Sequence, residues 1–295
     1  MTAPMLADAL GPRARRRVLV VSGAAGVALA AVLAIAVNRL ADKGQLDWER
    51  WEPLTQWAVL KFLLGGLVQT VKAAGAGMAA ALVLGAGLAL LRLSRAWPVR
   101  WLATAWVEFF RGVPLLLLIF FTFFALPKYG IDMSPYRALV LALAVYNGAV
   151  LGEIFRAGIL SLDRGQTEAA YAVGLGYWQA MLLVIIPQAL RRMVPAIVSQ
   201  LITLLKDTSL GFVITYEELL RRSRINGEFF QNPLQSTAFV AVVYIAVNLT
   251  LSRIAHRLEV RQRRRLGAGR IDVGGVEDLA TVGIAAEASA RPAGR

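Results

Sequence analysis

Residues 73–91 read AAGAGMAAALVLGAGLALL and contain no charged side chain. A helix needs about 20 apolar residues to cross the hydrocarbon core of a bilayer, so this run predicts a transmembrane helix. Small residues recur within it at every fourth position, at Gly77, Ala81 and Gly85. Such spacing lets two helices approach closely in lipid, although an alanine-rich composition alone gives a similar pattern.

The rest of the chain has the same character. Apolar residues make up 57% of its 295 residues and charged residues only 17%, whereas about a quarter of an ordinary soluble domain is charged. These proportions and the uncharged runs predict an all-α polytopic membrane protein with about six transmembrane helices. The predicted spans cover residues 18–37, 73–91, 105–126, 137–157, 189–214 and 236–255.

Cysteine is absent and histidine occurs once. The chain therefore lacks a disulfide framework, a thiolate metal site and a cysteine nucleophile. We expect no bound metal, because His256 cannot form a site alone, and we expect this side chain where the last helix leaves the bilayer.

The formal net charge of +13 resides at the ends of the apolar runs rather than in one groove-sized patch. This distribution follows the positive-inside rule and argues against nucleic-acid binding. Basic residues are dense at 13–17, 92–100 and 253–265. With the first of these segments in the cytoplasm, two predicted spans precede the second and six precede the third, so all three lie on the cytoplasmic side. We therefore expect both termini to be cytoplasmic, with the basic cluster at 221–224 as a local exception.

The two ends of the chain differ from its middle. Residues 1–17 are predicted to form a basic cytoplasmic N-terminus and residues 18–37 an additional first span. A cleaved signal peptide is the alternative, but its apolar core is only about 7–15 residues long. Residues 38–61 are polar and rich in tryptophan, and we expect them outside the cytoplasm. Residues 256–295 are predicted to be a cytoplasmic, largely disordered tail, because the part from Arg261 is charged and lacks aromatic residues.

A short insert separates the fourth and fifth predicted spans. Residues 167–187 read TEAAYAVGLGYWQAMLLVIIP, too broken for a spanning helix and too apolar for an ordinary loop. Thr167 is suited to capping a short helix, and Glu168 is suited to its positive end. Gly174 and Gly176 are expected to interrupt this helix.

A second short helix, WQAMLLVII, is predicted after the glycines, and Pro187 is expected to mark the turn into the next span. Two short helices at the cytoplasmic surface form a compact knob that exposes Ala169, Ala170 and Tyr171. Small residues on one face of a knob suit docking into a groove of another protein. A plain linker is the alternative interpretation.

The knob also carries a recognisable motif. Residues 168–187 follow the spacing E-A-A-x3-G-x9-I-x-L-P, with conservative replacements at Val184 and Ile186. The stretch resembles the motif of the permease subunits of binding-protein-dependent ABC importers. The resemblance implies the type I importer permease fold, with coupling helices at 163–187 that sit in a cleft of a cytoplasmic ATPase. It assigns ATPase coupling to Glu168, Ala169, Ala170, Tyr171, Gly174, Gly176 and Pro187.

Further stretches narrow the resemblance. VEFFRGVPLLL at 107–117, GEIFRAGI at 152–159 and LLKDTSL at 204–210 are similar to the permeases for polar amino acids of the histidine, glutamine and glutamate group. The similarity covers residues 62–255 and implies a permease domain of five core helices. The arginine-rich and alanine-rich chain resembles actinobacterial glutamate permeases, so glutamate is the expected substrate, followed by glutamine or aspartate.

Ionisable side chains within spans are costly and mark candidate functional sites. Glu108 and Arg111 are three residues apart, as are Glu153 and Arg156. Each pair therefore shares a helix face and can neutralise itself. We expect structural ion pairs at cytoplasmic helix ends, which could also hold the spans beside the knob.

Lys206, Asp207 and Thr208 form a different group. They lie about 28 Å beyond Pro187 along a continuous helix, at about 1.5 Å per residue, and therefore toward the outer leaflet. Adjacent helical residues do not face each other, so a wet cavity or a partner subunit is expected around them. We predict an outer gate or substrate path here, with fold-stabilising contacts as the alternative. Asn147 is a second candidate for this path, against an interhelical hydrogen bond.

The sequence contains no G-x4-G-K-[S/T] phosphate-binding loop, so energy from ATP would come from another chain. The resemblance implies ATP and Mg on a partner ATPase dimer, no cofactor on this chain, and transport rather than enzymatic activity. It implies a second permease chain, identical or homologous, and an extracytoplasmic amino-acid-binding protein, in the lipid of a bacterial plasma membrane. Contacts with the binding protein are predicted at Glu217, Glu218, Arg221 and Arg222.

A secondary amino-acid transporter is the alternative function. Such transporters are often built from inverted repeats with broken helices at the midplane. The sequence has no evident two-halved symmetry, and a cytoplasmic docking knob would remain unexplained. An intramembrane enzyme is disfavoured because no HExxH or GxSxG motif occurs.

Overall fold

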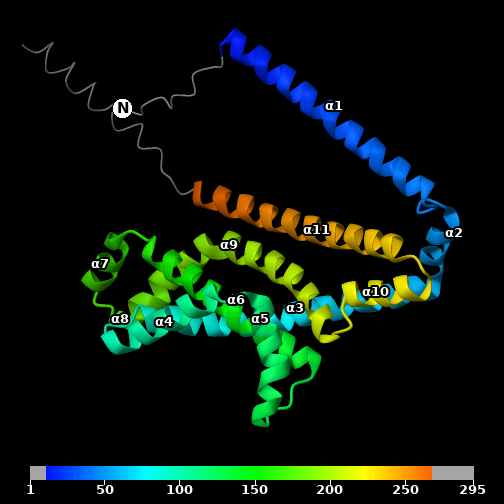
Figure 1. Ribbon diagram of the computed structural model, residues 1–295. Helices are drawn as coiled ribbons and strands as arrows, with labels where there is room; N and C mark the ends of the chain where they lie inside the picture. The colour runs from blue at the N-terminus through cyan, green and yellow to red at the C-terminus, as the bar shows by residue number, and fades with distance from the viewer. Residues whose placement is uncertain (1–10, 268–295) are drawn as a thin grey trace, which may run out of the picture. The chain divides into compact units, whose positions relative to one another are not determined.

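The computed structural model describes residues 11–267, which form helices and connecting turns without a strand in this range (Figure 1). Five helices are long and apolar enough to cross a membrane, and a bent helix pair raises this number to six. The prediction of an all-α protein with about six spans is therefore confirmed. The described chain divides into two compact units. One comprises residues up to Leu67 with Leu219–Val242, and the other comprises Val68–Glu218 with the residues from Val243 onward.

The long helices contain the predicted spans. The first, α1 (Pro12–Asp42), is apolar over most of its length, and none of its most apolar window is buried. A span that exposes apolar side chains on every side is suited to lipid or to a partner helix. The remaining long elements are α3 (Trp57–Arg92), α6 (Pro135–Leu160), the helical stretch from Tyr177 to Ile214, and α11 (Pro233–Gly267).

In the first unit, the segment after α1 is fastened to the turn between α10 (Leu219–Phe229) and α11. This segment contains α2 (Trp48–Trp51) and a 3-10 turn, Glu52–Thr55. The Arg50 guanidinium donates a hydrogen bond to the Gln231 carbonyl (3.1 Å), and the Asn232 amide donates to the Arg50 carbonyl (2.9 Å). The tryptophan-rich segment is therefore held by backbone carbonyl contacts that its composition did not reveal.

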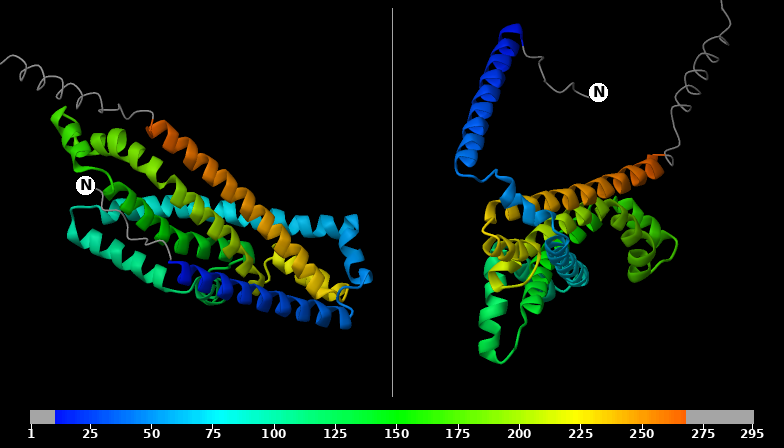
Figure 2. Two further views of the ribbon diagram at one scale, coloured as in Figure 1. Left: turned by 90° about the horizontal axis from the view of Figure 1, so that it is seen from above. Right: turned by 90° about the vertical axis from the view of Figure 1, so that its right-hand side faces the viewer.

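In the second unit, α6 supplies much of the core. It begins with Ser134 as its cap, whose hydroxyl accepts a hydrogen bond from the Arg137 amide at 3.3 Å. Its side chains Leu139, Leu143 and Leu151 are fully buried. The helix contacts α4 (Trp97–Gly112) and α9 (Ile186–Asp207), and the views in Figure 2 show these helices running alongside it.

Small residues form the seam between α3 and α6. A Cβ atom added to Gly85 would lie 2.8 Å from the Leu151 Cβ and 3.0 Å from the Gly148 carbonyl oxygen. A Cβ on Gly148 would lie 2.8 Å from the Leu84 side chain. The predicted close approach of small residues is therefore confirmed, and the partner helix contributes glycines of its own.

The expected third span, residues 105–126, is not one straight helix. It is divided between α4 and α5 (Leu115–Phe120), which meet at an angle of 100° (Figure 1). Pro114 lacks an N–H group and disfavours helical geometry in the preceding residue, and Val113 is accordingly extended (φ −80°, ψ 130°). The long apolar run that follows Pro114 concealed this break in the sequence.

The last helix, α11, continues past Arg261 to Gly267, within the segment expected to be a tail. No glycine or proline lies between Pro233 and Gly267, and the arginine, glutamine and leucine residues in between are good helix formers. The predicted tail beyond 267 and the first ten residues of the predicted basic N-terminus lie outside the described residues.

Candidate functional site

The predicted knob begins with α7 (Arg164–Ala172), which follows α6 after a short turn and lies beside α8 (Tyr177–Ala180) (Figure 1). Asp163 caps α7, because its carboxylate accepts a hydrogen bond from the Gly165 amide at 2.8 Å. The predicted capping role of Thr167 is therefore wrong. A cap must precede the first helical turn, and Thr167 lies inside the helix.

A glycine turn ends α7, as predicted. The Gly174 amide donates to the Tyr171 carbonyl (3.0 Å), and the Leu175 amide donates to the Ala170 carbonyl (3.1 Å). This pair of bonds is the Schellman arrangement, which places one residue in the left-handed region. That residue is Gly174, with φ +85°. Gly176 is extended and begins the next helix, with its amide bonded to the Gln179 side chain at 2.9 Å.

The second predicted short helix is wrong as a separate element. α8 continues through a π-helical turn, Met181–Ile185, directly into α9. A π turn shifts the hydrogen-bond pattern by one residue, which accommodates the missing N–H of Pro187 inside the helical stretch. Pro187 therefore lies within the span rather than at its entry. Residues 164–176 form the α7 knob.

The surface of the α7 knob differs from the expected one at a single position. Glu168 and Ala169 are exposed, and Tyr171 is 42% exposed. Ala170 is only 5% exposed, so its predicted exposure is wrong. α7 packs against α8 and the turn Met181–Ile185. In a helix packed on one side, the inward-facing residues recur every three or four positions, and Ala170 is one of them.

Two contacts from α9 hold the base of the α7 knob. The Arg192 guanidinium donates to the Ser161 carbonyl at 2.7 Å, and the Gln188 amide donates to the Gln166 side chain at 3.0 Å. A cavity of about 370 Å³, lined mainly by apolar side chains of α6, α7 and the helical stretch from Tyr177, lies beneath. The α7 knob is therefore attached to the spans that precede and follow it.

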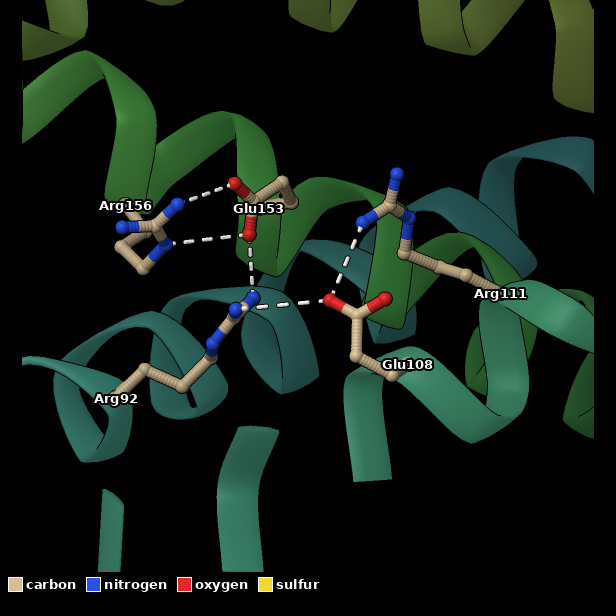
Figure 3. A network of polar contacts seen from close by, with 5 residues as sticks. All are labelled: Arg92, Glu108, Arg111, Glu153 and Arg156. Carbon is tan, nitrogen blue, oxygen red and sulfur yellow. Dashed lines mark hydrogen bonds and ion pairs between the residues drawn. The ribbon is translucent and has the colours of Figure 1, made fainter. Parts of the chain in front are cut away.

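The two predicted ion pairs are present, and a third arginine joins them (Figure 3). Glu108 lies 3.7 Å from Arg111, and Glu153 accepts hydrogen bonds from Arg156 at 2.5 and 3.2 Å. Arg92 forms an ion pair with Glu153 and lies 3.8 Å from Glu108. No local spacing signals the role of Arg92, because its partners belong to other helices.

The predicted gate residues lie where α9 ends. The α-helix stops at Asp207 and a 3-10 turn, Thr208–Ile214, follows, so the predicted break is confirmed. Lys206 is exposed and Asp207 is half-buried. Thr208 is fully buried, and its hydroxyl donates to the Leu205 carbonyl at 2.6 Å. Lys206 is thus the most exposed of the three.

Asn147 forms an interhelical hydrogen bond, and its predicted place on a cavity wall is wrong. The side chain is fully buried. It donates to the Leu143 carbonyl of its own helix at 2.9 Å and accepts from Gln200 on α9 at 2.6 Å. A buried amide needs such partners. The interhelical hydrogen bond, which was the alternative interpretation of this residue, is therefore present.

The predicted contact set at 217–222 is only partly exposed. Glu217 is exposed. Glu218 is buried and accepts a hydrogen bond from the Tyr244 hydroxyl at 2.8 Å, so it has no exposed surface for the predicted contact. Arg221 is half-buried. Arg222 is also half-buried, and its guanidinium donates to the Phe62 carbonyl at 2.8 Å.

Tyr216 stabilises the second unit just beyond the end of its span. Its hydroxyl donates a hydrogen bond to the Gln69 carbonyl at 3.0 Å. Burial raises the pKa of Tyr216 to about 12, with smaller effects of Tyr136 and Glu218 in the same direction. The hydroxyl therefore stays protonated at neutral pH and remains a donor. Among the described residues, no three acidic, cysteine or histidine side chains gather as a metal site would require.

This chain is similar to known transport proteins. The family described as "Binding-protein-dependent transport system inner membrane component" matches residues 81–264. "Probable glutamine ABC transporter permease protein GlnP" of Bacillus subtilis is 44% identical over 69% of this chain and 94% of its own length. "Glutamate transport system permease protein GluD" of Corynebacterium glutamicum is 37% identical over 78% of this chain and 85% of its own length.

Solved structures agree with these relatives. The structure titled "Crystal structure of an amino acid ABC transporter with histidines" is similar with a TM-score of 0.67 and 30% identity, over 70% of this chain and 97% of the other. A chain of the MetNI methionine ABC transporter has the same fold, with a TM-score of 0.62 and 19% identity, over 70% of this chain and 99% of that one. The chain described here belongs to the binding-protein-dependent transport system inner membrane components, a family of transport subunits embedded in the membrane.

Proposed function

We propose that this chain is the permease subunit of an ATP-driven importer for a polar amino acid, with glutamate as the first candidate and glutamine or aspartate as the next. The names of its relatives support the substrate class. The observation that carries the proposal is the α7 knob, a short exposed helix capped at both ends and placed between two spans. Its sequence holds the motif at 168–187 that suggested coupling to an ATPase.

The α7 knob would dock into a groove of a cytoplasmic ATPase dimer, which would hold the ATP and Mg. Glu168, Ala169 and Tyr171 would form its contact surface, because they are exposed. Arg192 and Gln188 would carry its movement into α9 through their bonds to Ser161 and Gln166. Both termini would then lie in the cytoplasm of a bacterium, and the distribution of basic residues supports this orientation.

The transport path would form between this chain and a second permease chain, either a copy or a homologue. Lys206 would face this path at the outer end of α9, where it is exposed. Its ammonium group offers a charge complementary to the carboxylates of an acidic amino acid. An extracytoplasmic binding protein would deliver the substrate near the exposed Glu217 and the half-buried Arg221.

The proposal is tested by uptake into proteoliposomes that contain this chain with its ATPase and binding protein. We expect uptake of labelled glutamate that needs both hydrolysable ATP and the binding protein. Unlabelled glutamate, glutamine, aspartate and histidine as competitors would rank the substrates. Uptake that runs without ATP and stops when an ion gradient is dissipated would instead support a secondary transporter.

A further inference from the structure

Arg92 joins three helices through one side chain. It is the last residue of α3, and its side chain is only 8% exposed. One end of its guanidinium pairs with Glu153 on α6, and another nitrogen lies 3.8 Å from Glu108 on α4. Figure 3 shows the guanidinium between the two carboxylates. The planar, fixed fork of arginine is well suited to holding two such partners.

Arg92 is not required to neutralise either carboxylate. Glu108 has Arg111 on its own helix at 3.7 Å, and Glu153 has Arg156 on its own helix at 2.5 Å. Loss of Arg92 would leave two self-neutral pairs, whereas loss of Glu153 would leave excess positive charge in a partly buried place. The specific contribution of Arg92 is therefore the connection between the helices.

Glu153 lies on the helix that leads into the α7 knob. α6 ends at Leu160, and Asp163 already caps α7. A helix transmits displacement along its length because its backbone hydrogen bonds are continuous. A movement of the α7 knob thus reaches Glu153 through α6.

Glu108 lies next to the bend between α4 and α5. α4 ends at Gly112, Val113 is extended, and the two helices differ in direction by 100°. Pro114 cannot donate a backbone hydrogen bond, so the helical bonding is weakest here and a change of angle costs least at this point. A force on Glu108 therefore acts within one turn of the most deformable point of the span.

We infer that Arg92 is a positioning residue that links the α7 knob to the α4–α5 bend, so that movement of the ATPase changes the angle of this span. The inference rests on the proposed function. It assigns Arg92 a role in transmission rather than in assembly. The partners are Glu153 on the side of the α7 knob and Glu108 on the side of the bend.

The test compares Arg92→Met with the wild-type complex in proteoliposomes. The measurement is the amount of amino acid transported per ATP hydrolysed. We expect this ratio to fall about two- to thirtyfold, the range that corresponds to the coupling effects of about 0.5–2 kcal/mol seen for substitutions along coupling networks, while the ATPase still co-purifies and hydrolyses ATP. Arg111→Met is the matched control. It removes another arginine of the network, but this one is 41% exposed and forms its ion pair with Glu108 on its own helix, so the ratio should stay near wild type.

Glu108→Gln provides a second test that does not endanger folding, because the Glu108 side chain is 61% exposed. It removes the negative charge that attracts Arg92 to α4 and leaves the Glu153 contacts in place, so the ratio should again fall. A wild-type ratio in Arg92→Met overturns the inference. If Arg92→Met does not fold, a wild-type ratio in Glu108→Gln overturns it. A wild-type complex without ATP-dependent uptake would instead contradict the proposed function.

Discussion

Glycine occurs both in the α3–α6 seam and in the α7 knob, but the two places need it for different reasons. At Gly85 the backbone is helical, and a Cβ atom would meet the Leu151 Cβ at 2.8 Å. At Gly174 nothing lies within 4 Å of an added Cβ, yet φ is +85°. One position requires space and the other requires backbone freedom.

The difference separates stability from coupling. The seam is buried between two spans, so a misfit there affects the folding of the membrane domain. The α7 knob is exposed and held at its base by a few hydrogen bonds, so a misfit there changes the shape offered to a partner. Substitution of Gly85 should therefore change mainly the amount of folded protein, and substitution of Gly174 should change mainly uptake.

The largest effect is expected for Gly85→Val. Its side chain cannot fit against the Leu151 Cβ and the Gly148 carbonyl without moving α6. Overpacking typically costs about 1–3 kcal/mol and sometimes more, so the amount of folded protein in the membrane and the melting temperature in detergent should both fall sharply. Gly87→Val is the matched control, because nothing lies within 4 Å of its added Cβ. Equal loss in both variants would show that helix propensity, rather than the seam, sets the effect.

Gly174→Val should abolish uptake with a smaller effect on stability. A β-branched side chain in the left-handed region costs roughly 1–2 kcal/mol and should open the turn that ends α7. Membrane levels should stay close to wild type, and ATP-dependent uptake should drop to background. Gly176→Ala is the control, since this residue has φ −70° and an added Cβ would lie 3.5 Å from its nearest neighbour. Full uptake in Gly174→Val would show that transport does not depend on this turn.

Lys206→Ala should reduce uptake without affecting either the seam or the α7 knob. The side chain is exposed at the end of α9, so its loss leaves no buried cavity. We expect an increase in the substrate concentration needed for half-maximal uptake, larger for glutamate than for glutamine, because only glutamate has a side-chain carboxylate. Equal effects on both substrates would place Lys206 in gating rather than in recognition.

The smallest effect concerns the hydrogen bond between Asn147 and Gln200. Hydrogen bonds between transmembrane helices are worth about 0.6–2 kcal/mol. A double-mutant cycle of Asn147→Ala and Gln200→Ala should give a coupling energy in this range, with uptake close to wild type. A changed substrate preference with no coupling energy would instead indicate that Asn147 lies on the transport path.

Local sequence patterns predicted the spans and the α7 knob, because apolar length and a glycine turn are properties of neighbouring residues. The bend at Val113–Pro114 was also encoded locally, but the surrounding apolar residues concealed it. The continuity of α8 and α9 was not predictable, because a π turn compensates for Pro187 only in three dimensions.

The contacts between helices in the site could not be predicted from the sequence. Arg92 and Glu153 are 61 residues apart, and no local spacing relates them. The same holds for Asn147 and Gln200, which are 53 residues apart. The burial of Ala170 depends on how α7 packs against α8 and the following turn, whereas its sequence neighbours Ala169 and Tyr171 are exposed. The motif identified the segment, but the packing determines which of its residues can meet a partner.

The central claim is that the α7 knob docks into an ATPase, and labelling of one engineered cysteine tests it most directly. The chain has no cysteine of its own, so Ala169→Cys provides a single exposed thiol on the α7 knob. Ala170→Cys provides a thiol one residue away at a buried position. A water-soluble maleimide would be applied to membranes that contain the permease, with and without its ATPase.

If the α7 knob docks into the ATPase, Ala169→Cys should be labelled rapidly in the permease alone and strongly protected when the ATPase is bound. Ala170→Cys should react slowly in both samples. Rapid labelling of Ala169→Cys at the same rate with the ATPase bound would contradict the account and leave the α7 knob as a linker between two spans.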